Sequence, residues 1–118
     1  MIEAIEAAQL NNIVVYGVRY TESRHGVLTA RNKYGIGVMA RISRETGGAD
    51  SDAGKEDLSK SFSRIGEELR DSYDLAYHAT SHPVPGTFHK LILRTKRPGL
   101  VVRVKTGYFD PLEVPANP

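Results

Sequence analysis

Residues 13–18 read Ile-Val-Val-Tyr-Gly-Val, a continuous apolar run rich in β-branched residues. A run without polar alternation is typical of a β-strand that is buried on both of its faces. Such strands lie in parallel sheets that are covered by helices. We therefore expect an α/β fold in which residues 13–18 form a central or near-central strand.

Helical patterns lie on both sides of this strand. Residues 2–10 form an Ala-rich pattern that the pair Asn11-Asn12 would end. Residues 33–45 predict a second helix, and Gly47 lies where a left-handed C-terminal cap belongs. The intervening residues 19–32 are polar and lack periodicity, which predicts a connecting loop.

The clearest helical pattern covers residues 57–72, after a loop of small residues and a very short edge strand that we expect behind Gly48. Its apolar side chains recur at i, i+4, i+7 and i+11, so they form one stripe along the helix. The stripe consists of Leu58, Phe62, Ile65 and Leu69.

Residues 73–79 alternate between apolar and polar side chains, which predicts a β-strand. We expect this strand to run parallel to residues 13–18 in one sheet, because a helical crossover joins parallel neighbours. Residues 80–86 contain two prolines and predict a loop.

The segment 87–109 predicts an antiparallel β-hairpin with a turn at residues 97–100. If Arg97 pairs with Leu100, the register places Leu91 opposite Thr106. One face of the hairpin is then apolar. The other face would carry the candidate anion-binding or partner-binding residues Lys90, Arg94, Lys96, Arg103 and Lys105.

The composition limits the class of protein to which this chain can belong. The chain has 118 residues, 40% hydrophobic and 25% charged, which is typical of one small globular domain. It contains no apolar run long enough to span a bilayer, and its first residues do not form a signal peptide. With no cysteine, it can hold neither a disulfide nor a thiolate metal site. We expect no cofactor.

Several stretches together resemble a VWFA-related (von Willebrand factor type A-like) domain of the acidobacterial type. The resemblance covers residues 2–111 and corresponds to the C-terminal half of such a domain. It rests on Ile2-Glu-Ala-Ile-Glu-Ala-Ala8, Asn12-Ile-Val-Val-Tyr-Gly-Val18, Ile42-Ser-Arg-Glu-Thr-Gly-Gly48, the segment 62–77, the segment 88–94 and the closing run 96–109, with its Arg-Pro-Gly turn and final Gly-Tyr-Phe.

The resemblance implies a three-layer α/β fold with a mostly parallel sheet, flanking helices and a C-terminal antiparallel β-hairpin. We expect residues 1–111 to form this partial domain and residues 112–118 to form a disordered tail. In the family, the first strand ends in Asp-x-Ser-x-Ser, the metal-ion-dependent adhesion site, and this chain begins after that strand. The resemblance also implies that a full-length form is secreted or periplasmic.

A literal Asp-x-Ser-x-Ser match does occur at Asp57, Ser59 and Ser61. A hard cation needs such oxygens on a loop that follows a strand, whereas these residues run directly into the third helical pattern. We interpret Asp57 and Ser59 as residues of the first helical turn, where they satisfy free N–H groups. We expect no metal site.

Histidines could offer a different metal site, because neutral imidazole is a common ligand. His78 and His82 are separated by the change from strand to loop, so no regular element holds them on one face with His89. Exposed loop histidines are the simpler interpretation.

Catalytic patterns are missing from the sequence: it has no nucleophile elbow, phosphate-binding loop or dinucleotide fingerprint. We therefore predict a non-enzymatic protein–protein interaction module that self-associates through residues 13–18 or takes an unidentified protein partner. The alternatives are an inert structural extension and an anion or nucleic-acid binder that uses the basic hairpin face. A net charge of only +2 disfavours nucleic acid.

Overall fold

A computed structural model describes residues 1–20, 23–24, 27–55 and 57–111; the predicted tail at 112–118 lies outside the described residues. Within these ranges the protein is a mixed α/β structure of three helices and small two-stranded sheets. The elements in chain order are α1 (Ile2–Leu10), β1 (Gly17–Arg19), β2 (Ser23–Arg24), β3 (Val27–Leu28), α2 (Ala30–Thr46), β4 (Asp50–Asp52), α3 (Leu58–Arg70), β5 (Phe88–Lys90) and β6 (Gly107–Phe109).

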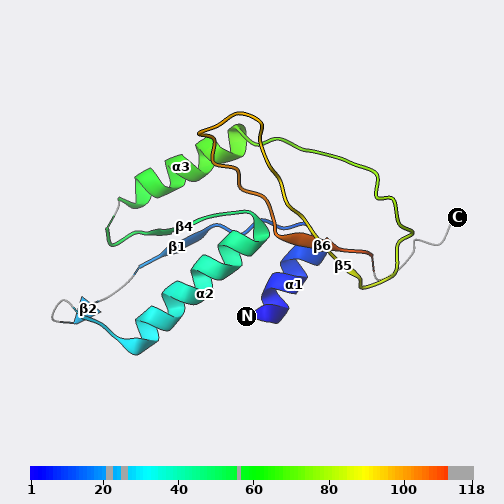
Figure 1. Cartoon of the computed structure of the whole chain (residues 1–118). Coiled ribbons are helices and arrows are strands. Elements are labelled where there is room, and N and C mark those ends of the chain that lie inside the picture. Colours follow the sequence, from blue (N-terminus) through cyan, green and yellow to red (C-terminus); the bar gives the residue numbers. More distant parts are fainter. Residues whose placement is uncertain (21–22, 25–26, 56, 112–118) are drawn as a thin grey trace, which may run out of the picture.

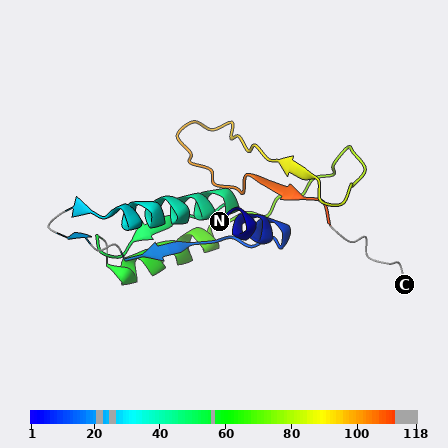
Figure 2. The same ribbon diagram turned by 90° about the horizontal axis from the view of Figure 1, so that it is seen from below.

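The centre of the fold is a parallel pair formed by β1 and β4, with Gly17 opposite Asp50. The expected short strand behind Gly48 is thus confirmed as β4. Arg19 on β1 bridges the carboxylates of Asp50 and Asp52 on β4, at 3.2 and 3.0 Å. In Figures 1 and 2, α2 lies on one side of this pair and α3 on the other. The observed sheet is a parallel pair, narrower than the predicted sheet.

The predicted strand 13–18 is wrong in its extent and its burial. Asn12 adopts a φ of 56° directly after α1, and the Ile13 N–H then bonds back to the Ala8 carbonyl at 2.8 Å. The Val15 N–H donates to the Thr46 hydroxyl at 3.0 Å. Because this N–H is taken by a side chain, the ladder begins only at Gly17, and Ile13 remains 54% exposed.

Helix α2 confirms the second helical prediction and extends it at the N-terminal end. Thr29 caps the helix, since its hydroxyl accepts the Asn32 N–H at 3.2 Å. The predicted loop 19–32 is therefore too long, and it also includes the antiparallel pair of β2 with β3. At the other end, Gly47 has a φ of 94°, which confirms the predicted left-handed cap.

Helix α3 confirms the third helical prediction. Asp57 is its N-cap, with a carboxylate oxygen accepting the Ser59 N–H at 3.2 Å. The helix ends at Arg70, two residues before the predicted end.

The predicted strand 73–79 is wrong. None of these residues belongs to a strand, and all of them are exposed. An alternating pattern yields a strand only where a sheet edge supplies hydrogen bonds, and the described hydrogen bonds give this backbone no such edge. The predicted loop 80–86 is confirmed as irregular structure.

The hairpin prediction is confirmed at its base. Strands β5 and β6 are antiparallel, with Phe88 opposite Phe109 and Lys90 opposite Gly107. This is the predicted register, and the Leu91 N–H continues it with a 2.9 Å bond to the Thr106 carbonyl. The arms between 92 and 105 form no ladder, and Arg103 of one arm pairs with Glu68 of α3.

The described residues bury little apolar side-chain surface. Ile5 and Ala8 of α1 are the buried hydrophobic residues within the described ranges. The radius of gyration is 17.4 Å, whereas a compact domain of this length would have about 13.5 Å. None of the helices described is long and apolar enough to cross a membrane. Much apolar surface is thus open to contact.

Candidate interaction site

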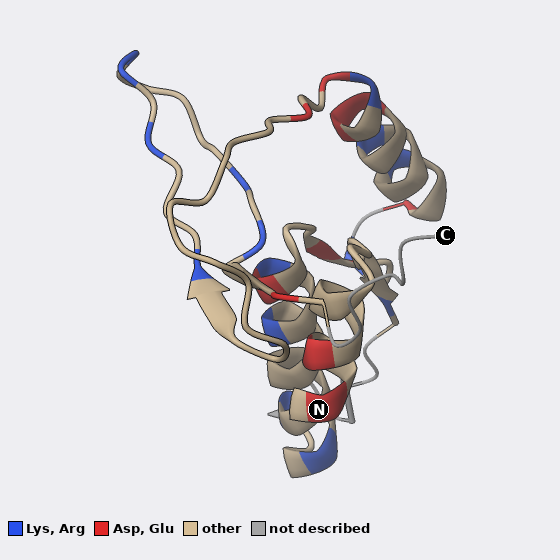
Figure 3. Ribbon diagram, turned by 90° about the vertical axis from the view of Figure 1, so that its right-hand side faces the viewer, with Lys and Arg blue, Asp and Glu red and all other residues tan. Residues whose placement is uncertain are grey.

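The five basic hairpin residues do not act as one uniform face. The Arg103 guanidinium pairs with the Glu68 carboxylate of α3, and Lys105 Nζ donates to Asn12 Oδ1 at 2.7 Å. Lys90, Arg94 and Lys96 are exposed, and Figure 3 shows Lys and Arg along both arms of the hairpin. Two of the predicted residues therefore hold the hairpin to the rest of the chain, and three point to solvent.

A polar and aromatic cluster closes the base of the hairpin. His89 on β5 contacts Asp110 Oδ2 at 2.9 Å, and its ring stacks on Tyr108 at a centroid distance of 4.9 Å. The same Asp110 oxygen accepts the Val84 N–H at 3.0 Å. The Tyr108 and Tyr77 hydroxyls are hydrogen-bonded at 2.7 Å. These contacts connect the loop before β5 to the end of β6. They also connect Tyr77, in the irregular segment, to β6.

Two ionisable groups of this cluster have a pKa that differs from its ordinary value. The hydrogen bond from His89, followed by that from the Val84 N–H, lowers the pKa of Asp110. The hydrogen bond with Tyr77 is the largest cause that raises the pKa of Tyr108 to about 12. Asp110 is thus held as a carboxylate and Tyr108 as a neutral phenol, which suits a structural contact.

The interpretation of His78 and His82 as exposed histidines is confirmed. His89 lies on β5, within the predicted hairpin, where it is half-buried and bonded to Asp110. Nowhere in the described ranges do three His, Asp or Glu side chains gather into a group that could hold a metal ion.

The Asp-x-Ser-x-Ser match lies at the start of α3. Asp57 caps the helix, which confirms the interpretation of the match as a helix start. Ser59 is exposed, whereas Ser61 is 1% exposed, on the side of the helix that contacts the rest of the chain. The absence of a metal site stays a prediction.

The apolar residues of α3 form an open surface on a regular helix. We call Leu58, Phe62, Ile65 and Leu69 the α3 stripe. Leu58, Phe62 and Leu69 are 50%, 60% and 55% exposed, and Ile65 is partly covered. The buried Ser61 lies beside the stripe, so the helix contacts the chain along its flank and leaves its apolar stripe uncovered.

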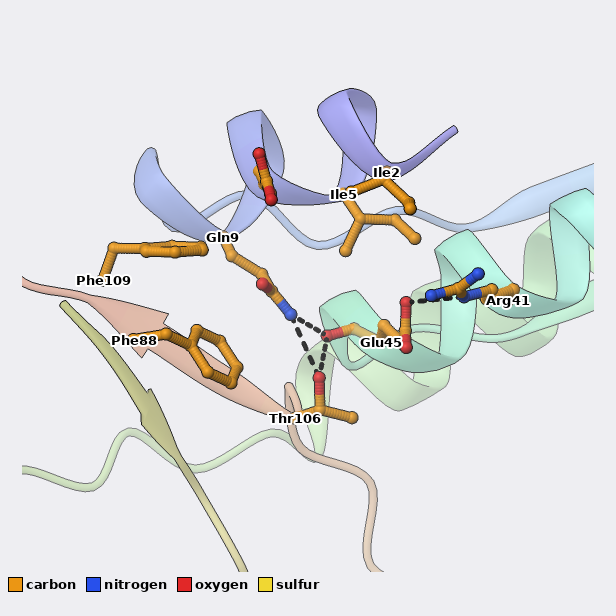
Figure 4. Close-up of a pocket in the computed structure, with 9 residues that line it drawn as sticks. Ile2, Ile5, Gln9, Arg41, Glu45, Phe88, Thr106 and Phe109 are labelled. Atoms are coloured by element: carbon orange, nitrogen blue, oxygen red, sulfur yellow. Dashed lines mark hydrogen bonds and ion pairs between the residues drawn. The ribbon is translucent and has the colours of Figure 1, made fainter. Parts of the chain in front are cut away.

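A cleft of about 270 Å³ lies between α1, α2 and the hairpin base. In Figure 4, Phe88 and Phe109 lie on one side of the Gln9 side chain, and Ile2 and Ile5 lie on the other. Gln9 Nε2 donates to the Glu45 carbonyl at 3.0 Å and to the Thr106 hydroxyl at 3.1 Å. The remaining lining residues are Glu6, Arg41, Glu45 and Thr106.

Sequence reasoning missed the cleft and the His89–Asp110 contact. Gln9 falls on the same predicted helix face as Ile2 and Ile5, so a polar residue on an otherwise apolar face was the available signal. No comparable signal marked Asp110, because its contact depends on how the loop before β5 folds back.

Comparisons of this chain with protein families, with curated proteins and with solved structures gave no match.

Proposed function

We propose that this protein is a non-catalytic protein–protein interaction module, similar to the C-terminal half of a VWFA-related domain, and that it binds its partner through the α3 stripe. The observation that carries the proposal is the exposure of Leu58, Phe62 and Leu69, each at least half open to solvent on a regular helix. An amphipathic helix is stable in water when its apolar stripe is covered.

Covering this surface would stabilise a complex. The three side chains are already about half covered, so covering the rest contributes about 1 kcal/mol for each of them along one helix. Open surfaces of this kind mark interaction sites in soluble proteins. The expanded radius of gyration supports the same proposal, because a less compact chain covers less of its own apolar surface.

The proposal includes a VWA-like arrangement of three layers. The parallel pair of β1 with β4 and the helices on its two sides support it. The side chains of Ile13 and Val14, which precede β1, are also exposed and add apolar surface that a second copy or another protein could cover.

Size-exclusion chromatography with light scattering tests the proposal. We expect the wild-type chain to elute above its monomer mass of 13.0 kDa or to precipitate without a partner. Phe62→Gln should reduce this association several-fold, because it places a polar amide in the α3 stripe. Tyr34→Gln is the matched control, since Tyr34 is 73% exposed on α2, away from the α3 stripe. A 13.0 kDa monomer that melts cooperatively would contradict the proposal.

A second candidate function is anion or nucleic-acid binding by the basic hairpin. It is favoured by the exposed side chains of Lys90, Arg94 and Lys96, on a segment without acidic residues. Fluorescence anisotropy with a labelled single-stranded oligonucleotide at 50 and 200 mM salt tests it. Binding that weakens steeply with salt and is lost in Arg94→Gln would support it, and salt-independent or absent binding would oppose it.

A further inference from the structure

The cleft between α1 and the hairpin base has the size of one side chain. Its volume of about 270 Å³ lies below the range of roughly 300–1,000 Å³ that is typical of small-molecule sites. Its apolar walls come from two sides, with Ile2 and Ile5 from α1 and with Phe88 and Phe109 from the hairpin (Figure 4). A protein partner could therefore insert a single long side chain between aliphatic and aromatic surfaces.

The floor of the cleft offers a hydrogen-bond acceptor. Gln9 is 6% exposed, and its Nε2 is fully engaged by the Glu45 carbonyl and the Thr106 hydroxyl. Among the described residues, nothing donates a hydrogen bond to the amide oxygen of Gln9. This oxygen is not among the described buried polar atoms that lack a partner, so it is accessible and can accept a hydrogen bond from a ligand that carries a donor.

The charge of the cleft favours a cation. Arg41 Nε pairs with the Glu45 carboxylate at 3.2 Å, so these two charges compensate each other. Glu6 is exposed at the same cleft and lies outside the described ion pairs. The lining therefore carries one uncompensated negative charge.

We propose that this cleft receives an arginine side chain of the protein partner. The proposal rests on the interaction-module function. A guanidinium has several donors for the Gln9 amide oxygen and the Glu6 carboxylate, and its flat face stacks on a phenyl ring such as that of Phe88. The methylene stem matches the apolar wall that Ile2 and Ile5 provide. A lysine ammonium is positive but lacks the flat, multi-donor head.

An NMR titration of the ¹⁵N-labelled full chain tests this assignment with three probes: N-acetyl-arginine amide, N-acetyl-citrulline amide and N-acetyl-lysine amide. Citrulline has nearly the same shape as arginine and is neutral. We expect the arginine probe to shift the amide signals of α1 and β6 and to bind about fivefold or more tightly than citrulline. The lysine probe should be intermediate. Equal binding of arginine and citrulline would overturn the assignment.

Two variants on the same helix sharpen the test. Glu6→Gln should weaken the arginine probe about threefold to tenfold, because it removes the free carboxylate of the cleft. Glu3→Gln is the matched control, since Glu3 is exposed on α1 and does not line the cleft. Equal losses in the two variants would show a general charge effect and overturn the proposal. Thermal melting by circular dichroism confirms that each variant is folded.

The outcome is separable from the test of the interaction module. Association by light scattering and binding of the arginine probe are measured on the same wild-type preparation. Association without probe binding overturns the cleft assignment and leaves the interaction module intact. Probe binding by a monomeric chain supports the cleft and counts against association through the α3 stripe.

Discussion

The two halves of the structure differ in how closely their elements approach. In the unit of α1, β1, α2 and β4, a Cβ on Gly17 would lie 2.6 Å from the Met39 methyl group, and one on Gly48 would lie 2.0 Å from the Val15 carbonyl oxygen. In the unit of α3 and the hairpin arms, Phe62 and Val101 are 60% and 89% exposed. The first unit is held by close packing, and the second leaves apolar surface uncovered.

Polar contacts do not compensate for this difference. The Arg103–Glu68 pair connects the hairpin to α3, but the Arg103 side chain is 45% exposed, and such pairs contribute about 0–1 kcal/mol. The first unit instead buries Thr46, whose hydroxyl accepts the Val15 N–H at 3.0 Å. We infer that the first unit supplies the stability of the isolated chain, and that the second unit gains order from a partner.

The largest expected effect tests the close packing of the first unit. Gly48→Ala places a methyl group against the backbone of Val15, which has no flexible end to move aside. We expect a loss of about 4 kcal/mol or more in the free energy of unfolding, enough to unfold a marginally stable domain. Urea titration followed by far-ultraviolet circular dichroism measures it. A variant with the wild-type midpoint would show that the two segments are not in close contact.

The next prediction compares equivalent truncations in the two units. Ile5→Ala removes a side chain that is 5% exposed and should cost about 3 kcal/mol, through lost burial and the cavity left behind. Leu69→Ala removes a side chain that is 55% exposed and should cost about 0.5 kcal/mol in the monomer. Both values come from urea titration at low protein concentration. Equal costs would show that the α3 stripe is covered within the chain.

The sequence predicted elements that depend on local spacing. The apolar stripe of α3, the cap at Gly47 and the hairpin register at Leu91 and Thr106 follow from periodicity or from the position of one turn. It mispredicted elements that depend on distant partners. Residues 73–79 alternate like a strand, yet the strand assignment requires a sheet edge that the described chain does not give them.

The predicted site residues divide in the same way. The sequence placed Lys90, Arg94 and Lys96 on one basic face, and they are exposed. It could not predict that Arg103 pairs with Glu68, because the residues are 35 positions apart and meet only through the fold. The cleft around Gln9 was missed for this reason too, since its lining comes from three separate segments.

The pH dependence tests whether the hairpin base behaves as an ordered part of the fold. Because the pKa of Asp110 is lowered, its contribution to stability is complete above its ordinary pKa of about 3.9 and is lost as pH falls through the lower folded value. We expect the His89 and Val84 NMR signals to keep their folded positions at the ordinary aspartate pKa and to lose them only at more acidic pH.

The Asp110→Asn variant is the control for this titration, because its amide does not take up a proton in that range. It should remove the acid transition at His89. The acid transition at Arg19 should persist, since the Gly54 N–H and the Arg19 guanidinium also lower the pKa of Asp52. An unchanged His89 transition in the variant would show that another group controls the hairpin base.

The last expected effect is a small gain in stability, at a glycine of the first unit where there is room for a methyl group. Gly35 lies within α2 and is exposed, and a Cβ added there would meet no atom within 4 Å. Gly35→Ala should therefore raise the free energy of unfolding by about 0.5–1 kcal/mol, because alanine loses less backbone entropy in a helix. The same urea titration that detects the loss in Gly48→Ala should detect this gain. The two variants make the same chemical change at two glycines. A loss of stability in Gly48→Ala together with a gain in Gly35→Ala would place the close packing between residues 15 and 48. A loss of stability in Gly35→Ala would mean that α2 is covered on that side.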